Sequence, residues 1–399
     1  MALLWPTFAK AERPGETLIV IQRTDLRAGE KVVGTLSPGE EVLVMEVKGN
    51  LVCVASVRIG WVRRTDVSQP DRAYAAFDRQ VFMRTADADT YLGRAGAANC
   101  RCKLNDAVND YGEAIRLDPK KSEAYAKRGQ CWLAKGRIDK AMADFTKALA
   151  LNEQDPVSLS GRAAVLMQKG SLEAARRDVE KAIQLVPDYA EAYVTRGFVM
   201  ERRREFQKAV DDFNHAIQLR GYDPNIVMHR GDAWFESGSY NKAIDDYSAA
   251  YRIFRSDTYL RHQARAYLAA GKSGPAIDDL KAVVWTETSD DRTLNELAWL
   301  QATCPDDEAR DGAGAVKNAT KACELTAWKN AAHLDTLAAA YAESGDFGHA
   351  VGFEKKALSL APQTDKADLE IRLQLYKSRK PYRESLQAIS SRAAQGGWN

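Results

Sequence analysis

The sequence lacks the features of a membrane-spanning or strongly charged protein. No apolar run approaches the roughly 20 residues that are needed to span a bilayer. The 57 Lys and Arg residues nearly balance the 55 Asp and Glu residues, and a net charge of +2 gives no general case for binding nucleic acid or acidic membranes. Residues 1–15 include Ala9-Lys10-Ala11, an Ala-x-Ala pattern, but no positive n-region, so we expect a tail that is at most the stub of a signal peptide.

Known motifs of enzymes and metal sites are also missing. The six cysteines show no Cys-x-x-Cys spacing, and the five histidines fall at no metal-ligand spacing. There is no Gly-rich phosphate loop and no nucleophile-elbow motif. We therefore expect no catalytic residue, no metal and no cofactor. A disulfide between Cys304 and Cys323 stays open, because the sequence does not supply the Cα separation that such a bond requires.

The clearest positive signal is a trio of Ala, Asp and Ala that returns at a constant interval. Its first member recurs every 34 residues at Ala107, Ala141, Ala175, Ala209 and Ala243, and again after 33 residues at Ala276. A fixed period of this length is typical of stacked repeats, in which each unit buries its apolar face against its neighbours. The period predicts a binding scaffold without indicating its ligand.

Each period is predicted to form two amphipathic helices, because apolar residues recur three and four positions apart in both halves. Small residues at the eighth, twentieth and twenty-seventh positions should let the two helices approach closely. Breaks such as Lys135-Gly136 and Ser237-Gly238 separate the helices. About eight units are expected within residues 88–364, with their first residues at Ala88, Ser122, Pro156, Ala190, Pro224, Asp257, Asp291 and Ala331.

These positions resemble those of the tetratricopeptide repeat family, whose 34-residue pattern contains Leu-Gly, an aromatic, Ala, Phe, Ala and Pro. Gly197 and Phe213 fit this pattern in the fourth repeat, whereas the Trp expected at the fourth position is replaced there by Tyr193. The final Pro remains only at Pro119 and Pro187 among the six regular repeats. The resemblance implies a mostly α-helical solenoid, a right-handed superhelix of helical hairpins that binds a protein or peptide on its concave side.

Caps are expected at both ends of the repeats, since terminal units of such arrays need a polar outer face. Residues 70–87 should form a linker that contains a lone second helix and caps the repeats. Ala73 and Phe77 lie 34 residues before Ala107 and Tyr111, which occupy the same positions in the second helix of the first repeat. Residues 365–384 should form a C-terminal capping helix whose apolar stripe includes Leu369, Leu373 and Tyr376.

The chain beyond that cap is predicted to be a tail. It covers residues 385–399 and follows the basic run Lys377–Arg383. Such runs are usually solvated chain ends.

Residues 16–69 differ from the rest of the chain. Short β-branched runs, separated by Gly, Pro and charged residues, predict five strands at Leu18–Ile21, Val32–Leu36, Val42–Met45, Leu51–Val54 and Gly60–Val62. Gly49-Asn50 is a hairpin signal between two of them. This segment resembles a bacterial SH3-like domain, which implies a small β-barrel. Because Trp61 is its only aromatic residue, recognition of proline-rich peptides is not expected.

Arg at the seventh position and Asp at the twenty-third position recur through the repeats. In antiparallel helices these positions can face each other within one repeat or across to the next. One interpretation is a basic ladder for an acidic ligand. We favour the other, a structural pair with bidentate hydrogen bonds, for Arg128 with Asp144, Arg196 with Asp212 and Arg230 with Asp246.

The inner surface of this family is lined by the second, fifth, ninth and twelfth positions of each first helix. Apolar anchors beside two arginines would suit a peptide with a hydrophobic side chain and an acidic group. An aromatic residue at helical spacing can equally belong to the core. The predicted ligand groove consists of Phe198, Glu201, Met228, Asp232, Phe235, Arg261, Arg265, Asn295 and Trp299.

These observations predict a non-enzymatic scaffold for a protein or peptide partner of unknown identity. An alternative is a cell-envelope protein whose SH3-like domain binds a wall or glycan component while the repeats recruit partners. A third hypothesis is a regulatory subunit of an enzyme. A bacterial origin is expected from the SH3-like segment. Cytoplasmic location, export and oligomeric state stay open.

Overall fold

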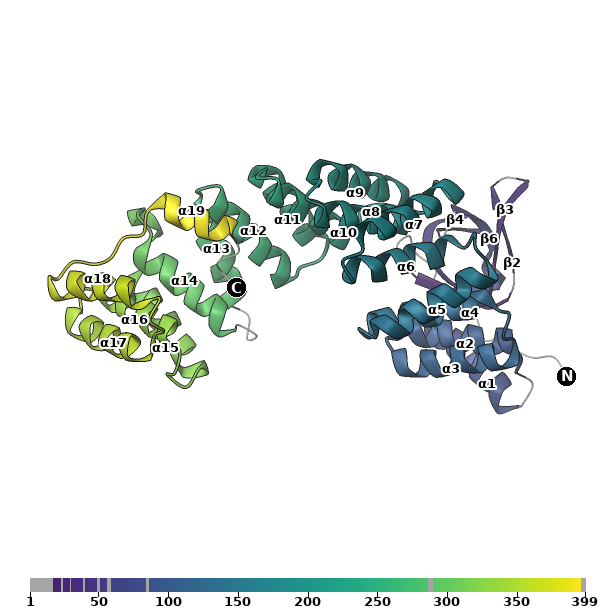
Figure 1. The fold of residues 1–399 in the computed structure, drawn as a ribbon, viewed down its shortest axis with the longest axis horizontal. Coiled ribbons are helices and arrows are strands. Elements are labelled where there is room, and N and C mark those ends of the chain that lie inside the picture. Colours follow the sequence, from purple (N-terminus) through teal and green to yellow (C-terminus); the bar gives the residue numbers. More distant parts are fainter. Residues whose placement is uncertain are drawn as a thin grey trace. The chain divides into compact units, whose positions relative to one another are not determined.

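The computed structural model describes residues 17–22, 24–28, 30–38, 40–48, 51–55, 59–83, 86–285 and 290–395. The expected tail of residues 1–15, the turn at Gly49-Asn50 and the last four residues lie outside this set. The chain separates into two compact units, Met1–Gly221 and Tyr222–Asn399, and each is described by itself (Figure 1).

The first unit begins with an antiparallel sheet in the strand order β3-β2-β6-β5-β4-β1-β7. Among the described residues β3 pairs only with β2, and β7 pairs only with β1, so the sheet is open. The closed barrel predicted from the sequence is therefore wrong. Strands β2 and β7 were not predicted, because β2 has few apolar residues and β7 contains only two residues. The strands are β1 (Thr17–Val20), β2 (Thr24–Ala28), β3 (Lys31–Leu36), β4 (Glu41–Lys48), β5 (Leu51–Ala55), β6 (Ile59–Arg63) and β7 (Val67–Ser68).

Strand β1 shows how the sheet is attached to the helices. Leu18 and Val20 are buried in the apolar core of the sheet. The residue between them, Ile19, points to the opposite face, as the two-residue period of a strand requires. Ile19 is fully buried against Phe77 of α1 and Ala97 of α2, so the sheet is part of the first unit's core.

Helical hairpins make up the remainder of the first unit. Their turns are closed by residues in the left-handed region, which glycine adopts without strain. Gly136, with φ 66°, donates its N–H to the Leu133 carbonyl at 2.9 Å and allows the next helix to reverse direction. The helices are α1 (Pro70–Phe82), α2 (Ala88–Cys100), α3 (Leu104–Leu117), α4 (Ser122–Ala134), α5 (Ile138–Leu151), α6 (Pro156–Gln168), α7 (Leu172–Leu185), α8 (Ala190–Arg202) and α9 (Phe206–Arg220).

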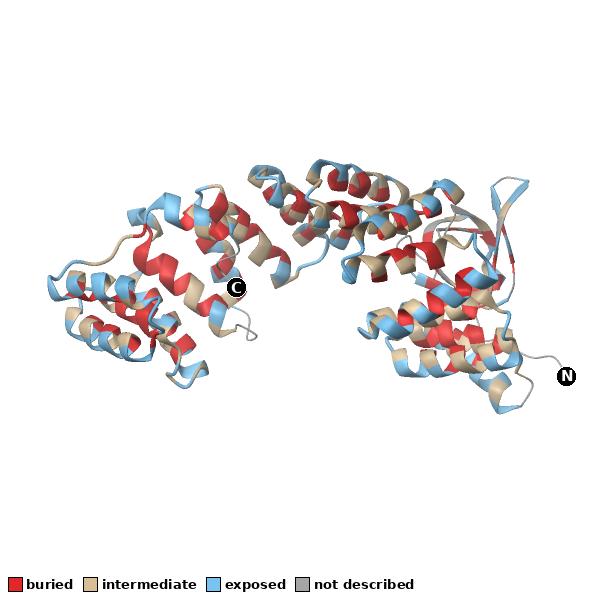
Figure 2. Cartoon of the chain, in the orientation of Figure 1, coloured by how far each residue is buried: buried red, intermediate tan, exposed pale blue. Residues whose placement is uncertain are grey.

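In the fourth and fifth repeats the glycine at the eighth position makes room for an aromatic ring from the second helix. A Cβ atom on Gly197 would lie 2.8 Å from the Phe213 ring, and one on Gly231 would lie 2.8 Å from the Tyr247 ring. Both rings are almost fully buried. Figure 2 shows the buried residues along the facing sides of paired helices, which is where close packing places the core.

The second unit contains further hairpins and then two C-terminal helices. Residues 304–311 separate α14 from α15. Leu369, Leu373 and Tyr376 are buried on α18, in agreement with the expected apolar stripe. The helices are α10 (Pro224–Glu236), α11 (Tyr240–Ile253), α12 (Asp257–Ala269), α13 (Ser273–Val284), α14 (Asp291–Thr303), α15 (Gly312–Leu325), α16 (Ala331–Glu343), α17 (Phe347–Leu360), α18 (Lys366–Lys377) and α19 (Leu386–Ala394).

Helix α19 is a departure from the sequence-based expectation. It occupies part of the segment that was predicted to be a tail, and it packs against α12 instead of extending into solvent (Figure 1). The prediction missed it because α19 buries only Ile389 and Ala393, too few residues to give a helical pattern in the sequence.

Candidate functional site

The recurring Arg and Asp residues pair within each of the first five repeats, joining the first helix of the repeat to its second. Arg128 donates from Nε and Nη2 to the two carboxylate oxygens of Asp144, each at 2.8 Å. Such bidentate bonds fix the orientation of both planar groups. The same bonds join Arg94 with Asp110, Arg162 with Asp178, Arg196 with Asp212 and Arg230 with Asp246.

Burial makes these pairs part of the helix interface. Asp212 is 5% exposed, and burial raises the pKa of its carboxyl even though Arg196 opposes that change. The hydrogen bonds that Arg196 donates to Asp212 in turn raise the pKa of Arg196. Each guanidinium thus satisfies a carboxylate of its own repeat, buried in all of these pairs except Arg162–Asp178, which favours the structural interpretation over a basic ladder for a ligand.

The pairing stops at the sixth repeat. Gln263 stands where Arg stands in the first five, and its amide donates to Ser248 Oγ at 2.7 Å. The Oδ2 atom of Asp279 is buried and has no hydrogen-bond partner among the described residues. Burial, followed by the nearby Asp278, raises the pKa of Asp279 to about 7. A cavity of about 550 Å³ opens beside this carboxyl and Gln263.

The nine residues of the predicted groove belong to different units. Phe198 and Glu201 lie on α8 in the first unit, and the other seven lie in the second unit. The Phe198 ring packs edge-on against Phe213, with ring centroids 5.5 Å apart, so it contributes to the core of its repeat. We therefore sought a binding surface in the second unit.

Asp232 on α10 is the centre of a polar network. Its carboxylate accepts a hydrogen bond from Tyr247 Oη at 2.8 Å and lies 3.1 Å from His262 Nδ1 and 3.3 Å from His229 Nδ1. Burial by itself would raise the pKa of Asp232, but these bonds hold it well below its usual range. The network ties α10 to α11 and α12, while Met228 packs at the edge of the adjoining apolar core.

Helix α12 provides two arginines with different partners. Arg261 forms an ion pair with Asp290 at 3.1 Å, just before α14. The Arg265 guanidinium lies 4.2 Å from the centre of the Phe235 ring, in a cation–π contact. Its Nε also donates to the backbone carbonyl of Ala393 on α19 at 2.9 Å. The predicted ligand contact at Arg265 is thus made by the chain's own C-terminal segment.

Trp299 on α14 is contacted by the same segment. Its indole Nε1 donates to the Glu384 carboxylate at 2.7 Å, and its ring lies 5.9 Å from that of Tyr382. The Glu384 backbone N–H donates to the Thr303 carbonyl at the end of α14 at 2.9 Å. Arg392 completes the arrangement with a 2.7 Å bond to the Glu384 carboxylate.

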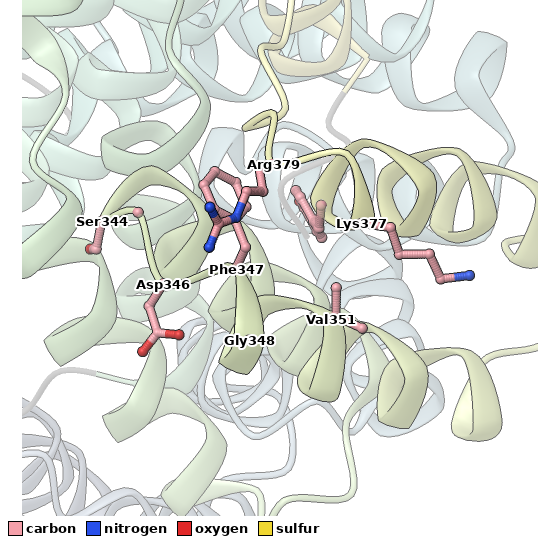
Figure 3. Close-up of a pocket in the computed structure, with 9 residues that line it drawn as sticks. Ser344, Asp346, Phe347, Gly348, Val351, Lys377 and Arg379 are labelled. Carbon is pink, nitrogen blue, oxygen red and sulfur yellow. The ribbon is translucent and has the colours of Figure 1, made fainter.

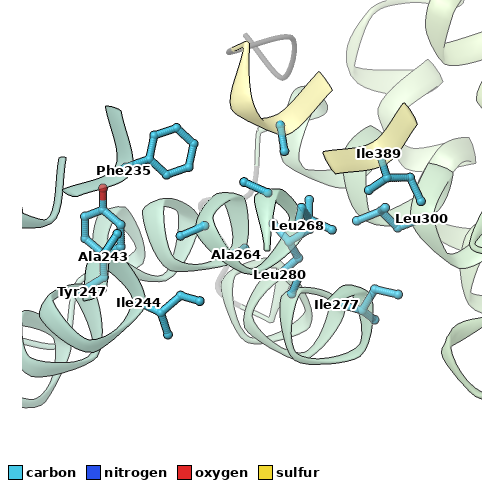
Figure 4. Close-up of a cluster of buried hydrophobic side chains, with 14 of the residues drawn as sticks. Phe235, Ala243, Ile244, Tyr247, Ala264, Leu268, Ile277, Leu280, Leu300 and Ile389 are labelled. Carbon is cyan, nitrogen blue, oxygen red and sulfur yellow. The ribbon is translucent and has the colours of Figure 1, made fainter. Parts of the chain in front are cut away.

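Apolar contacts hold α19 itself. Ile389 and Ala393, four residues apart, are both fully buried in a cluster with Phe235, Leu268 and Leu300. Figure 4 shows Ile389 beside Leu300 of α14 in this cluster. Full burial of one isoleucine contributes roughly 1.5–3 kcal/mol. A helix of nine residues is too short to be stable alone, so α19 depends on this contact.

We call the surface formed by Phe235, Arg261, Arg265 and Trp299 the α10–α14 face. Sequence analysis identified these four residues but not Glu296, which lies among Arg261, Arg265 and Arg392 and feels the charge of each. Burial raises the pKa of Glu296 to about 7. The sequence signal that could have identified Glu296 is its position on α14, the first helix of the repeat that also carries Trp299.

A second polar cluster was also missed by the sequence. Arg372 on α18 donates to both carboxylate oxygens of Asp335 on α16, at 2.8 and 3.0 Å. Glu354 on α17 is fully buried beside them, and burial followed by the charge of Asp335 raises its pKa to about 10. The cluster locks the capping helix onto the last repeat. Its only sequence signal was Arg372 between the apolar residues of α18.

The end of α18 borders an open pocket of about 520 Å³. It is lined by the turn between α16 and α17 and by residues around Tyr376. In the view of Figure 3, Asp346 and Lys377 lie on opposite sides of this lining, with Phe347 and Arg379 between them. The Asp346 carboxylate lies 2.6 Å from His349 Nδ1, so it is already paired within its own turn.

The second unit contains two buried cysteines. Cys304 and Cys323 are both buried, and both are free thiols. Burial raises the pKa of Cys323 to about 11, which makes its thiolate a rare species near neutral pH.

Among the helices that the structure describes, none has the length and apolar character to cross a membrane.

Comparisons with known proteins agree with the helical hairpins. A model of the tetratricopeptide repeat family matches residues 103–156 and 201–258. No curated protein matches the chain. Among solved structures, a tetratricopeptide repeat protein from Parabacteroides merdae is 16% identical, with a TM-score of 0.41 over 73% of this chain and 98% of its own.

Two further solved structures are similar over long stretches. A human IFIT1 dimer with PPP-AAAA is 16% identical, with a TM-score of 0.50 over 74% of this chain and 69% of its own. Pseudomonas aeruginosa pilF is 17% identical, with a TM-score of 0.42 over 56% of this chain and 96% of its own. At such identities the likeness concerns the fold alone. Residues 103–156 and 201–258 therefore match tetratricopeptide repeats, which are stacked helical hairpins.

Proposed function

We propose that this chain is a non-enzymatic scaffold that binds a helical segment of a protein partner on the α10–α14 face. The observation that carries the proposal is that this face already binds a helical segment: the Arg265 guanidinium donates to Ala393 of α19, and the Trp299 indole donates to Glu384 just before it. Helix-in-groove recognition uses an apolar edge of the ligand and a few polar anchors around it. Both are present here.

The polar and aromatic composition of the α10–α14 face supports the same conclusion. Interfaces are enriched in aromatic residues and Arg, and such residues often carry most of the binding energy. Phe235, Trp299 and Arg265 combine these types on three successive first helices. Arg261, whose side chain is 40% exposed, adds a cation that is paired with Asp290 at the edge of the face.

For the N-terminal sheet, an SH3-like role in binding a wall or glycan component has less support. The sheet buries Ile19 against α1 and α2, which suits a domain that closes the end of the repeats. Trp61, its one aromatic residue, is half-buried, and the Lys48 ammonium lies 5.2 Å from its ring centre. We therefore assign partner binding to the helical repeats.

Site-specific photo-crosslinking tests the proposed function. A photoreactive amino acid placed at position 261, on the α10–α14 face, is compared with one at position 252, an exposed site on α11. After capture from cells, mass spectrometry identifies the crosslinked protein and the crosslinked peptide. We expect one partner to crosslink through a helical peptide at position 261 and not at position 252. Crosslinks at position 252 alone would contradict the proposal.

A further inference from the structure

The C-terminal segment of residues 382–394 returns to the α10–α14 face after the capping helix α18 has already closed the last repeat. Its anchors are distant in sequence: Glu384 contacts Trp299, and Ala393 contacts Arg265 across 128 positions. End capping does not require this second helix, since α18 supplies three buried apolar residues and the Arg372–Asp335 pair. The segment therefore needs another explanation.

Polar anchors define where the segment begins. Glu384 is buried, and its carboxylate accepts bonds from Trp299 of the face and from Arg392 of α19. The Ser385 hydroxyl accepts a bond from the Ala388 N–H, which starts the helix immediately after the anchor. A carboxylate followed directly by a capped helix is thus the polar signature of what this face binds.

A single apolar edge holds the helix that follows. Ile389 and Ala393 are fully buried, whereas Leu386 is 47% exposed and Gln387, Ala388 and Ser391 are exposed as well. One turn of apolar contact is a small interface compared with α18. A helix that is held by so few residues, and that is unstable when released, can be displaced by a competitor with the same pattern.

We infer that residues 382–394 are an intramolecular ligand that blocks the α10–α14 face until a partner helix displaces them. The inference rests on the proposed function, because it concerns access to the same face. The partner it specifies is an amphipathic helix with a carboxylate before its first turn, a β-branched apolar residue five positions later and a small residue four positions after that. Glu384, Ile389 and Ala393 define this spacing.

The test uses the full chain and a fluorescently labelled synthetic peptide of residues 380–395 as the probe. Fluorescence anisotropy measures binding to the wild type, to Ile389→Asp and to Leu386→Asp. The last variant is the matched control, because Leu386 lies on the exposed edge of the same helix. Ile389→Asp should bind the peptide roughly tenfold or more tightly than the wild type, since the competing state is removed. The control should bind like the wild type.

A second peptide, with Asp in place of Ile389, should bind none of the proteins. Equal affinity of the three proteins for the unmodified peptide would overturn the inference, while leaving the face as a binding surface. Absence of binding to Ile389→Asp, with hydrogen exchange showing residues 386–394 unprotected, would also overturn it. Crosslinking at position 261 then decides the proposed function independently. If circular dichroism shows that Ile389→Asp does not fold, Glu384→Ala replaces it, because it loosens the anchor without placing a charge in the core.

Discussion

The two units share their apolar packing but differ in how they use charge. In the first unit every regular repeat has an Arg–Asp pair between its helices, as in Arg196–Asp212. In the second unit only Arg230–Asp246 follows that pattern, and the next repeat has Gln263 and the unpaired Asp279. In that same repeat Arg261 and Arg265, which lie at other positions than the paired arginines, contact Asp290 and α19. The paired arginines thus join the two helices of one hairpin, whereas these two arginines contact segments outside their hairpin.

The ends of the chain also close the two units differently. In the first unit the sheet contacts the second repeat through a hydrogen bond between the side chains of Ser37 and Glu123. Burial raises the pKa of Glu123, and the nearby negative charge of Glu40 adds to that increase. That contact belongs to a folded sheet with its own core. In the second unit α18 closes the last repeat, and the α10–α14 face is covered by α19, nine residues that bury two side chains. The α10–α14 face of the second unit is therefore easier to uncover than the end of the first unit.

The largest expected effect is loss of a buried pair from the first unit. Asp212→Ala should lower the free energy of unfolding by about 3 kcal/mol, because it leaves Arg196 without its carboxylate in a largely buried position. A urea titration followed by circular dichroism measures this. The neighbouring exposed Asp211→Ala is the control and should change stability by less than about 0.5 kcal/mol. Equal, small losses of stability for both variants would show that the Arg–Asp pairs do not stabilise the helix interface.

The second prediction concerns what the units have in common. Ala209 on α9 and Ala276 on α13 occupy the same repeat position, and both are fully buried. Replacing either by Leu should destabilise the protein by about 2 kcal/mol, since the added carbons overpack two closely spaced helices. Thermal unfolding of both variants provides the measurement. If Ala209→Leu lowers the melting temperature and Ala276→Leu does not, the packing of the two units differs after all.

The third prediction uses the pH dependence of the unpaired carboxyl. The pKa of Asp279 is about 7 in the folded state, above its unfolded value, so the folded state holds a proton that the unfolded state releases. Stability from this group is complete below the unfolded pKa and is lost as pH rises toward 7. The full pKa change would correspond to roughly 4 kcal/mol at pH 8, and solvent screening of this partly exposed side chain reduces that effect. Asp279→Asn should therefore stabilise the protein by about 1.5 kcal/mol at pH 8 and by less than about 0.5 kcal/mol at pH 4. Unfolding titrations at both pH values test this, and the same gain at both would exclude titration of Asp279.

The smallest expected effect comes from rebuilding the missing pair. Gln263→Arg should stabilise the protein by about 1 kcal/mol at neutral pH, because Asp279 gains a bidentate partner in a partly exposed position. Gln263→Lys is a suitable control, since it adds the charge without the fork. Direct titration of Asp279 by nuclear magnetic resonance should show its pKa falling in the Arg variant. An unchanged pKa would mean that the two side chains do not meet.

Much of the fold could be predicted because its determinants are local. Gly136 closes its turn, and Gly197 admits Phe213, through positions that recur at a constant spacing. The open sheet could not be predicted, because β2 (Thr24–Ala28) joins through backbone pairing more than through an apolar run. In the candidate site, Phe235, Arg265 and Trp299 were found from their positions on first helices, whereas Glu296 was not.

The sequence by itself determined the repeating helical hairpins, because the spacing of small, aromatic and paired polar residues acts between neighbouring helices. Only the tertiary structure decided which face is covered. The contacts of Glu384 with Trp299 and of Ala393 with Arg265 join segments 85 and 128 residues apart. No periodic pattern encodes such contacts, since they depend on where the chain leads after α18 and on a few side chains that meet there.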